Sequence, residues 1–184
     1  MKVKIKNLEK FWKIMHPRNV VIVGSGQYGK DANFMACGWN TPIAEDVPSC
    51  GIVVDKKTYT FELIEKYKEF SINILPFEKI DLIFFLGSVS GREVNKIEKA
   101  NLKVKKGEKT NVPIIEDCLA FAECKVINYV DVGEVRFYIG KVLNAEYEKD
   151  LYDERFGFDL KKVKIPFHIK GNFFTTNGII KESK

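Results

Sequence analysis

Glycine and proline after the first strand restrict this chain more than any other feature of its sequence. The runs VVIVG (20–24) and CGIVVD (50–55) are rich in β-branched residues and predict two strands. Between them stand Gly38, Pro42 and Pro48, which leave no room for a long helix. The loop SGQYGKD is rich in turn-forming residues, so we expect a hairpin in which ANFMACGWN pairs with the first strand.

Three glycines in the same segment also spell a dinucleotide-binding motif. Gly24, Gly26 and Gly29 form G-x-G-x-x-G directly after a strand, and a later strand ends on Asp55. That motif needs the third glycine to open a helix of roughly 10 or more residues, whose N-terminus holds the pyrophosphate. Residues 30–41 contain a glycine and are followed by Pro42, and no second strand–helix–strand unit appears after residue 100. A Rossmann-type NAD(P)-binding oxidoreductase is therefore kept only as the alternative to the hairpin.

The rest of the chain predicts further strands with helices inserted between them. Thr58 or Thr60 is a candidate N-cap for the helix TFELIEKYKE. Two long segments, 119–133 and 134–148, are β-branched and aromatic and predict an extended antiparallel hairpin. The other expected elements are a strand over 70–75, a short helix from Ile80 to Gly87 and a helix over GREVNKIEKA (91–100). We therefore expect a mainly β fold with inserted helices, forming a barrel, in a single domain over residues 1–184.

The charge distribution argues against nucleic acid as a partner. Thirty Lys and Arg stand against twenty-five Asp and Glu, and both signs are interspersed along the chain rather than clustered. No apolar run approaches the roughly 20 residues of a membrane helix, and the N-terminus lacks the apolar core of a signal peptide. We expect a cytoplasmic protein that binds neither nucleic acid nor membrane.

Cysteine and histidine usage does not predict a metal site. The four cysteines form no C-x-x-C pair, and only two histidines are available as further ligands. We expect the cysteines to be buried free thiols, because free cysteine is among the most buried residue types. Cys37 is of further interest because it lies in the second strand of the expected hairpin.

In that second strand, alternation divides the side chains between two faces. Asn33, Met35, Cys37 and Trp39 should share one face, and the residues between them the other. Core packing accounts for methionine and cysteine on this face. It accounts less well for Asn33 and Trp39, because a buried amide needs hydrogen-bond partners.

Four motifs occur in an order and at a spacing typical of one family. They are RNVVIVG, GKDANFMACGW, the pair TYTFELI and EFSINIL, and SVSGREVNK. Together they resemble the flavin reductase-like family of FMN-binding split β-barrels, and most closely its flavoredoxin branch. The resemblance covers most of the chain and implies a fold of that class with bound FMN.

The phosphate of FMN requires cations and oriented N–H donors. Ser90, Gly91 and Arg92 stand where the predicted helix 91–100 begins, and Lys96 follows one turn later. We expect these four residues to bind the phosphate. The alternative is that SGRE is only a favourable helix start and that both cations are surface charges.

The isoalloxazine ring requires hydrogen bonds at one edge and flat contacts at the other. Backbone groups of Met35, Ala36 and Cys37 are candidates for the hydrogen bonds, and Trp39 for the flat contact. The resemblance adds Asn33 and Thr60, although helix capping is an equal alternative for Thr60. It also implies a C-terminal aromatic residue, Phe173 or Phe174, of which we assign Phe173 to cover the ring.

These residues lead to one function and two alternatives. The expectation is an FMN-binding oxidoreductase, either flavin reductase-like or flavoredoxin-like, with NAD(P)H giving hydride to flavin N5 and a redox partner protein as one candidate acceptor. No catalytic side chain is assigned, because the cofactor carries the electrons. The resemblance also implies a homodimer with flavin near the interface. The alternatives are the Rossmann-type protein and a non-enzymatic FMN-binding module.

Overall fold

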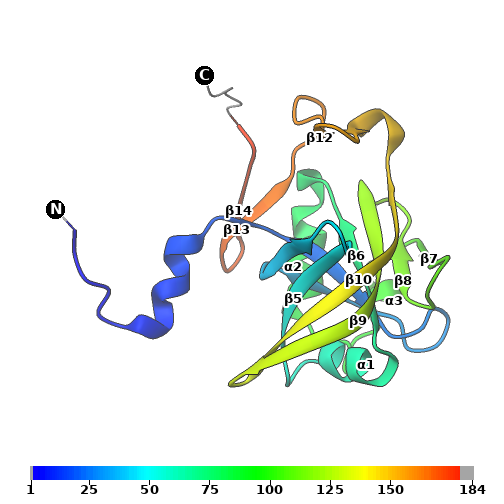
Figure 1. Cartoon of the computed structure of the whole chain (residues 1–184), viewed down its shortest axis with the longest axis horizontal. Helices are drawn as coiled ribbons and strands as arrows, with labels where there is room; N and C mark the ends of the chain where they lie inside the picture. The colour runs from blue at the N-terminus through cyan, green and yellow to red at the C-terminus, as the bar shows by residue number, and fades with distance from the viewer. Residues whose placement is uncertain (1, 179–184) are drawn as a thin grey trace.

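The computed structural model describes residues 2–178, and its main body is one curled antiparallel sheet of seven strands (Figure 1). The sheet order is β3-β2-β6-β9-β10-β5-β4. Its strands are β2 (Val21–Ser25), β3 (Asn33–Cys37), β4 (Asn40–Ala44), β5 (Ser49–Asp55), β6 (Glu69–Ile74), β9 (Ala120–Val132) and β10 (Val135–Tyr147). The sheet curls until Val53 N–H of β5 donates to Trp39 C=O after β3, at 2.9 Å. The expected mainly β barrel is confirmed.

β2 and β3 form the predicted hairpin, with Val23 opposite Met35 and Ser25 opposite Asn33. The turn between them needs glycine at position 26, where φ is +79° and an added Cβ would stand 2.2 Å from Asp31 O. The Rossmann-type alternative is wrong. The segment after the third glycine is an extended strand, so no helix N-terminus is present there to hold a pyrophosphate.

The long hairpin of β9 and β10 is also confirmed. Its turn lies at Gly133, and two register shifts interrupt the pairing, the first with an extra residue on β9 at Ile127 and the second with an extra residue on β10 at Leu143. Such bulges increase the local twist and help a sheet close on itself. The hairpin joins the two halves of the barrel, because β9 pairs with β6 and β10 pairs with β5.

Two of the three predicted helices form where expected. Helix α1 (Tyr59–Tyr67) is capped by Thr58, whose hydroxyl accepts from Phe61 N at 3.2 Å. Helix α2 (Ile80–Ser88) ends one residue beyond the predicted Gly87. The predicted helix over 91–100 is wrong, since α3 (Lys96–Lys99) has only four residues and residues 91–93 form a turn.

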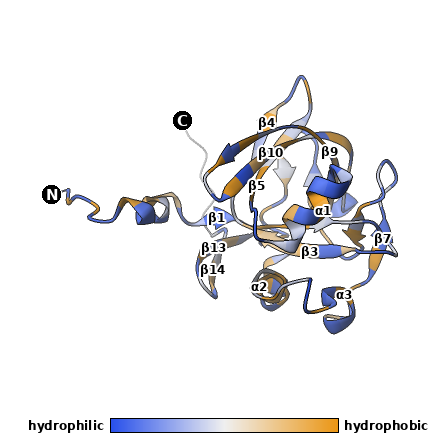
Figure 2. Cartoon of the chain, turned by 90° about the horizontal axis from the view of Figure 1, so that it is seen from below, coloured by the Kyte–Doolittle hydropathy of each residue, from blue (hydrophilic) through white to orange (hydrophobic). Residues whose placement is uncertain are grey.

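The core has two parts, on the two faces of the sheet. Inside the barrel, Cys37 packs with residues such as Phe70, and Met35 lies against that cluster. On the outer face, Phe34 packs under α2, with Ala36 beside it. Figure 2 shows α2 and α3 together against the outside of β3. The predicted division into two faces is therefore confirmed for Met35 and Cys37 against Phe34 and Ala36, whereas Trp39 lies beyond the end of β3.

Outside the barrel, both ends of the described chain meet in a small sheet. Strand β1 (Arg18–Asn19) pairs with β13 (Pro166–Lys170), which pairs with β14 (Phe173–Thr176). A 3₁₀ helix, η1 (Leu8–Met15), projects away from the barrel with no buried residue (Figure 1). The remaining strands are β7 (Val104–Lys106), β8 (Pro113–Ile115), β11 (Tyr152–Asp153) and β12 (Gly157–Phe158), and the other 3₁₀ helices are η2 (Phe77–Lys79) and η3 (Lys149–Leu151).

The cysteines are free thiols with different degrees of burial. Cys37 and Cys124 are buried, whereas Cys50 and Cys118 are half-buried. The Sγ atoms of Cys50 and Cys124 lie 3.5 Å apart. Among residues 2–178, no helix has the length and hydrophobicity needed to cross a bilayer.

Candidate functional site

A buried hydrogen bond joins the start of β3 to the first turn of α1. Asn33 Nδ2 donates to Thr60 Oγ1 at 3.0 Å, and both side chains are only 2% exposed. Because Thr58 caps α1, Thr60 is free of that role and its hydroxyl faces β3 instead. The buried amide of Asn33, which core packing did not explain, therefore has a hydrogen-bond partner in Thr60, another predicted site residue.

Gly91 closes over this pair. A Cβ added at Gly91 would stand 2.2 Å from Asn33 Oδ1 and 2.9 Å from Tyr59 Cδ1, so only glycine fits. The turn is held by Ser90, whose hydroxyl accepts from Arg92 N at 3.2 Å. Residues from three separate parts of the sequence thus meet at one junction, formed by Asn33, Thr60 and Gly91.

This junction lines a cavity of about 320 Å³, which we call the site pocket. An open cleft of about 620 Å³ adjoins the site pocket and shares Asn33, Gly91 and Arg92 with it. Seven predicted site residues line the site pocket, namely Asn33, Met35, Thr60, Ser90, Gly91, Arg92 and Lys96. Its lining also includes Lys57, Tyr59, Gly87 and Glu93, which the sequence analysis did not assign.

Arg92 stands at the rim of the site pocket with an acidic neighbour. Its Nη2 donates to Glu62 Oε1 at 2.6 Å, and its Nη1 donates to Lys57 O at 2.9 Å. The hydrogen bond from Arg92 lowers the pKa of Glu62, although the slight desolvation of that carboxyl opposes the shift. The guanidinium is therefore already oriented, and its charge is partly balanced.

Lys96 is buried, contrary to the expectation of a cation on an open helix face. Its Nζ donates to Phe34 O at 2.8 Å and to Leu86 O at 2.7 Å, and desolvation lowers its pKa to about 8. Lys96 does not lie one turn into an exposed helix, because α3 begins only at Lys96 itself. Lys96 ties β3 to the last turn of α2, where helix carbonyls favour a cation. Two of its three N–H donors serve this purpose.

The outer edge of β3 presents the backbone of Ala36. Phe34 O accepts from Lys96, so it points away from β2, while Asn73 Nδ2 donates to Ile22 O on the far side of β2. Backbone groups alternate along an antiparallel strand, so the N–H and C=O of Ala36 also point outward. Those of Met35 and Cys37 point toward β2. Met35, Ala36 and Cys37 were predicted to offer backbone groups to the ring. Of these three residues, only Ala36 has its N–H and C=O on the open edge of β3.

Cys37 contributes neither its backbone nor its thiol to the site pocket. Its Sγ donates toward Trp39 O at 3.4 Å inside the barrel wall. Burial raises the pKa of this thiol to about 11, so it is not a thiolate at neutral pH. Cys37 therefore has a packing role in the barrel wall.

Trp39 is 44% exposed and stands between two further cavities. One of about 340 Å³, the aromatic cavity, contains Ala36, Gly87 and Phe174; the other has about 190 Å³. Gly87 lies close to Ala36 and lines both the aromatic cavity and the site pocket, which are therefore neighbours. The site pocket and the aromatic cavity together follow the edge of β3.

The C-terminal aromatic residue in the aromatic cavity is Phe174 and not Phe173. Phe173, which the sequence analysis assigned to cover the ring, is 59% exposed and is not part of the cavity lining, so the structure does not bring it to the other predicted site residues. Successive residues of β14 point to opposite faces, and only Phe174 packs toward His168, with ring centroids 5.2 Å apart. The sequence alone did not identify which face of this strand is inward.

Comparison with known proteins identifies the family. The family model described as flavin reductase like domain matches residues 14–164. The chain belongs to this family. It is 31% identical over 166 residues to YddH, an uncharacterized protein of Escherichia coli, with 89% of this chain and 88% of that protein covered. It is 25% identical to a ferric-chelate reductase (NAD(P)H) of Archaeoglobus fulgidus, covering 78% of this chain and 83% of that one.

Among solved structures, the flavoredoxin of Methanosarcina acetivorans is similar over the whole chain. It superimposes with a TM-score of 0.85 at 28% identity, covering 100% of this chain and 95% of the flavoredoxin. The expected flavin reductase-like family with flavoredoxin relatives is confirmed. Membership supports a flavin-binding, oxidoreductase-like role for this chain.

Proposed function

We propose that this protein is an FMN-binding oxidoreductase that accepts hydride from NAD(P)H. The observation that carries the proposal is the junction of Asn33, Thr60 and Gly91, which three distant segments build at the end of an open strand edge. The reductase named among the relatives uses NAD(P)H, which supports the same donor here.

The phosphate end of FMN fits the site pocket. Three cationic residues line it, Lys57, Arg92 and Lys96, against one acidic residue, Glu93. A phosphate monoester carries close to two negative charges and is favoured by such an excess. Exposed Arg92 and half-buried Ser90 meet the phosphate directly, while buried Lys96 adds its charge from below.

The ring end fits the edge of β3. Ala36 offers one outward N–H and one outward C=O, and small residues at Ala36 and Gly87 allow a flat molecule to approach closely. Trp39 and Phe174 supply flat apolar walls beyond it. FMN would supply the hydride acceptor, and the chain's own residues hold the cofactor, orient it and limit water around it.

A comparison of two ligands tests this assignment. Arg92→Ala should weaken FMN binding about tenfold or more and leave riboflavin binding unchanged, since only FMN carries the phosphate. Arg155→Ala is the control, because Arg155 is exposed on the far β11–β12 turn. Equal losses for FMN and riboflavin would remove the phosphate assignment. We leave Lys96 out of this test because its substitution also disturbs β3 and α2.

Anaerobic addition of NADH or NADPH to the flavin-loaded protein tests the reaction. Bleaching of the flavin absorbance supports the oxidoreductase, with a redox partner protein or a small molecule as the acceptor. A flavin spectrum that neither nucleotide changes supports a non-enzymatic FMN-binding module instead.

We also propose that the protein is a cytoplasmic homodimer. Helix η1 exposes Leu8 and Ile14 by 74% each and buries none of its residues, which is unfavourable for an isolated chain. A second copy of the chain is the proposed cover for this face, which places the flavin near the interface. Light scattering on the purified full chain tests it, and a monomer mass would contradict it.

A further inference from the structure

Both tryptophans and both histidines of the chain gather at one place. Trp12, His16, Trp39 and His168 all line the aromatic cavity, and the sequence contains no other tryptophan or histidine. The rings are in contact, since the centroids of Trp12 and His16 lie 4.9 Å apart and those of His16 and His168 lie 5.9 Å apart. Trp12 and His16 come from the N-terminal segment, which reaches this place through β1.

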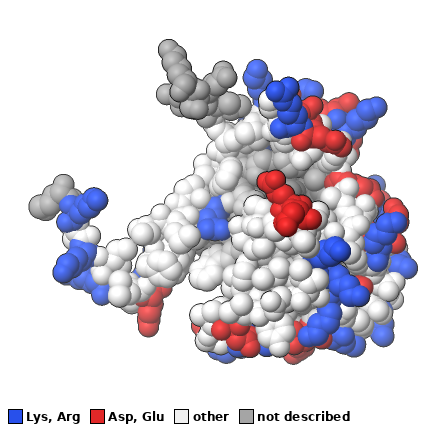
Figure 3. All heavy atoms as spheres, in the orientation of Figure 1, with Lys and Arg blue, Asp and Glu red and all other residues white. Residues whose placement is uncertain are grey.

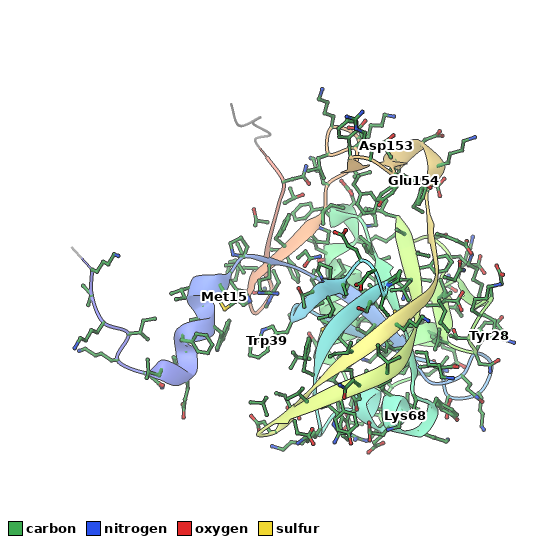
Figure 4. All side chains as sticks on the ribbon, viewed as in Figure 1. Met15, Tyr28, Trp39, Lys68, Asp153 and Glu154 are labelled. Atoms are coloured by element: carbon green, nitrogen blue, oxygen red, sulfur yellow. The ribbon has the colours of Figure 1, made fainter. Side chains whose placement is uncertain are left out.

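Three of these residues, Trp12, His16 and Trp39, also line the smaller cavity of about 190 Å³, which we call the arm cavity. Trp12 and Met15 form its wall on the N-terminal side, and Trp39 and Phe137 form its wall on the barrel side. Figure 4 shows Met15 and Trp39 on opposite sides of the gap between η1 and the barrel.

The size of the arm cavity selects a single ring. An apolar cavity of about 150 Å³ is large enough to bind benzene. At about 190 Å³ the arm cavity has room for one six-membered ring with a small substituent. The arm cavity shares no lining residue with the site pocket, so its ligand occupies a separate place from the phosphate of the cofactor.

One fixed cation borders this apolar space. Arg18 donates from Nε to Gly38 O at 3.1 Å and from Nη2 to Asn40 O at 3.0 Å, which leaves further donors of its guanidinium unused. No Asp or Glu lines the arm cavity, and Arg18 belongs to no ion pair found within residues 2–178. Figure 3 shows a mostly uncharged surface between η1 and the barrel. A held guanidinium beside apolar walls suits a carboxylate, whose two oxygens match its donors.

We propose that the arm cavity binds a single-ring aromatic carboxylate, with the ring against Trp12 and Trp39 and the carboxylate on Arg18. The cavity shares Trp39 with the aromatic cavity, which in turn contains Ala36. If FMN lies along β3, as in the proposed function, this ligand occupies the position of a second substrate beside it. Binding itself requires only the residues of the arm cavity.

Tryptophan fluorescence reports on this binding directly, because both tryptophans are in the cavity wall. Flavin-free protein is titrated with benzoate and with benzyl alcohol, which has the same ring and no charge. We expect saturable changes with benzoate and at least tenfold weaker binding of benzyl alcohol. Equal affinity for both ligands, or a change that never saturates with benzoate, would overturn the proposal.

A substitution at Arg18 tests the role of the charge. Arg18→Gln should abolish the preference for benzoate over benzyl alcohol, whereas Arg155→Gln, which removes an exposed arginine elsewhere, should leave it intact. An unchanged preference in Arg18→Gln overturns the assignment of the carboxylate to Arg18. If Arg18→Gln does not fold, the comparison of the two ligands on the native chain still decides.

Separate calorimetric titrations of the flavin-free protein with FMN and with benzoate distinguish this proposal from the proposed function. If FMN fails to bind while benzoate binds the flavin-free chain, only the proposed function is lost. If FMN binds and benzoate does not, only the aromatic carboxylate site is lost.

Discussion

Lys96 should make the stability of this protein rise with pH in the alkaline range. Lys96 is 5% exposed, and its ammonium contacts two carbonyls and has no carboxylate partner among the described residues, so desolvation lowers its pKa to about 8. A lysine in the unfolded chain keeps its proton up to a pKa of roughly 10.4. Between these two values the unfolded state binds more protons than the folded state. Raising the pH through this window therefore favours folding.

The magnitude follows from the two pKa values. Below pH 8 both states are protonated and Lys96 contributes no slope. Between pH 7 and pH 10 the linkage adds about 2.5 kcal/mol to the free energy of unfolding of the native chain. Lys96→Met has no such group, so the difference in stability between the native chain and this variant should grow by that amount.

Urea denaturation at pH 7 and pH 10 measures both proteins under the same conditions. Other lysines, tyrosines and thiols also titrate in this range, but their contributions cancel in the difference between the two chains. Lys99→Met, on the exposed side of α3, is the control and should show no pH-dependent difference. A change below about 0.5 kcal/mol for Lys96→Met, which is within the error of additivity, would refute the buried-ammonium argument.

Two further predictions concern Glu123 and Gly91. Burial alone would raise the pKa of Glu123, but hydrogen bonds from Asn144, Thr110 and nearby backbone N–H groups outweigh it and lower that pKa. Urea denaturation at pH 7 should therefore show that Glu123→Gln lowers the free energy of unfolding by about 3 kcal/mol. This loss should shrink as the pH falls toward the range in which carboxyl groups titrate, and a loss independent of pH would contradict the argument. Gly91→Ala should push the 90–93 turn off Asn33 and weaken FMN binding about tenfold by fluorescence titration, at a stability cost of about 1–3 kcal/mol. Gly178→Ala, where an added Cβ meets nothing within 4 Å, should bind FMN like the native chain.

Local signals in the sequence were sufficient for the barrel hairpins. A glycine and two prolines between residues 37 and 49 exclude a long helix, and that exclusion alone separates the observed β2–β3 hairpin from a dinucleotide-binding fold. The β9–β10 hairpin is equally local, since both strands flank one turn at Gly133. Features of this kind depend on neighbours in the chain and can be predicted from it.

Features that depend on tertiary contacts were predicted less well. The pattern of GREVNKIEKA favours a helix from residue 91, but Gly91 is held against Asn33, and Asn95 provides the N-cap through Glu98 N at 3.4 Å. The helix is therefore reduced to its last turn, and the cation expected on its exposed face becomes the buried Lys96. Likewise, the choice between Phe173 and Phe174 depends on which face of β14 meets His168, and no local pattern contains that information.

The cluster of tryptophan and histidine rings also depends on a contact between segments that are far apart in the sequence, so local patterns do not predict it. Arg18 pairs with His168 in the register of β1 and β13, although 150 positions separate them in the sequence. This pairing brings the N-terminal segment with Trp12 to the same edge of the barrel as Trp39. Since β1 has only two residues, few backbone hydrogen bonds hold the N-terminal segment in place, and the aromatic contacts across the cavities must supply part of its attachment. A ligand that fills the arm cavity would therefore also order η1, so the affinity for that ligand and the order of this segment are coupled properties.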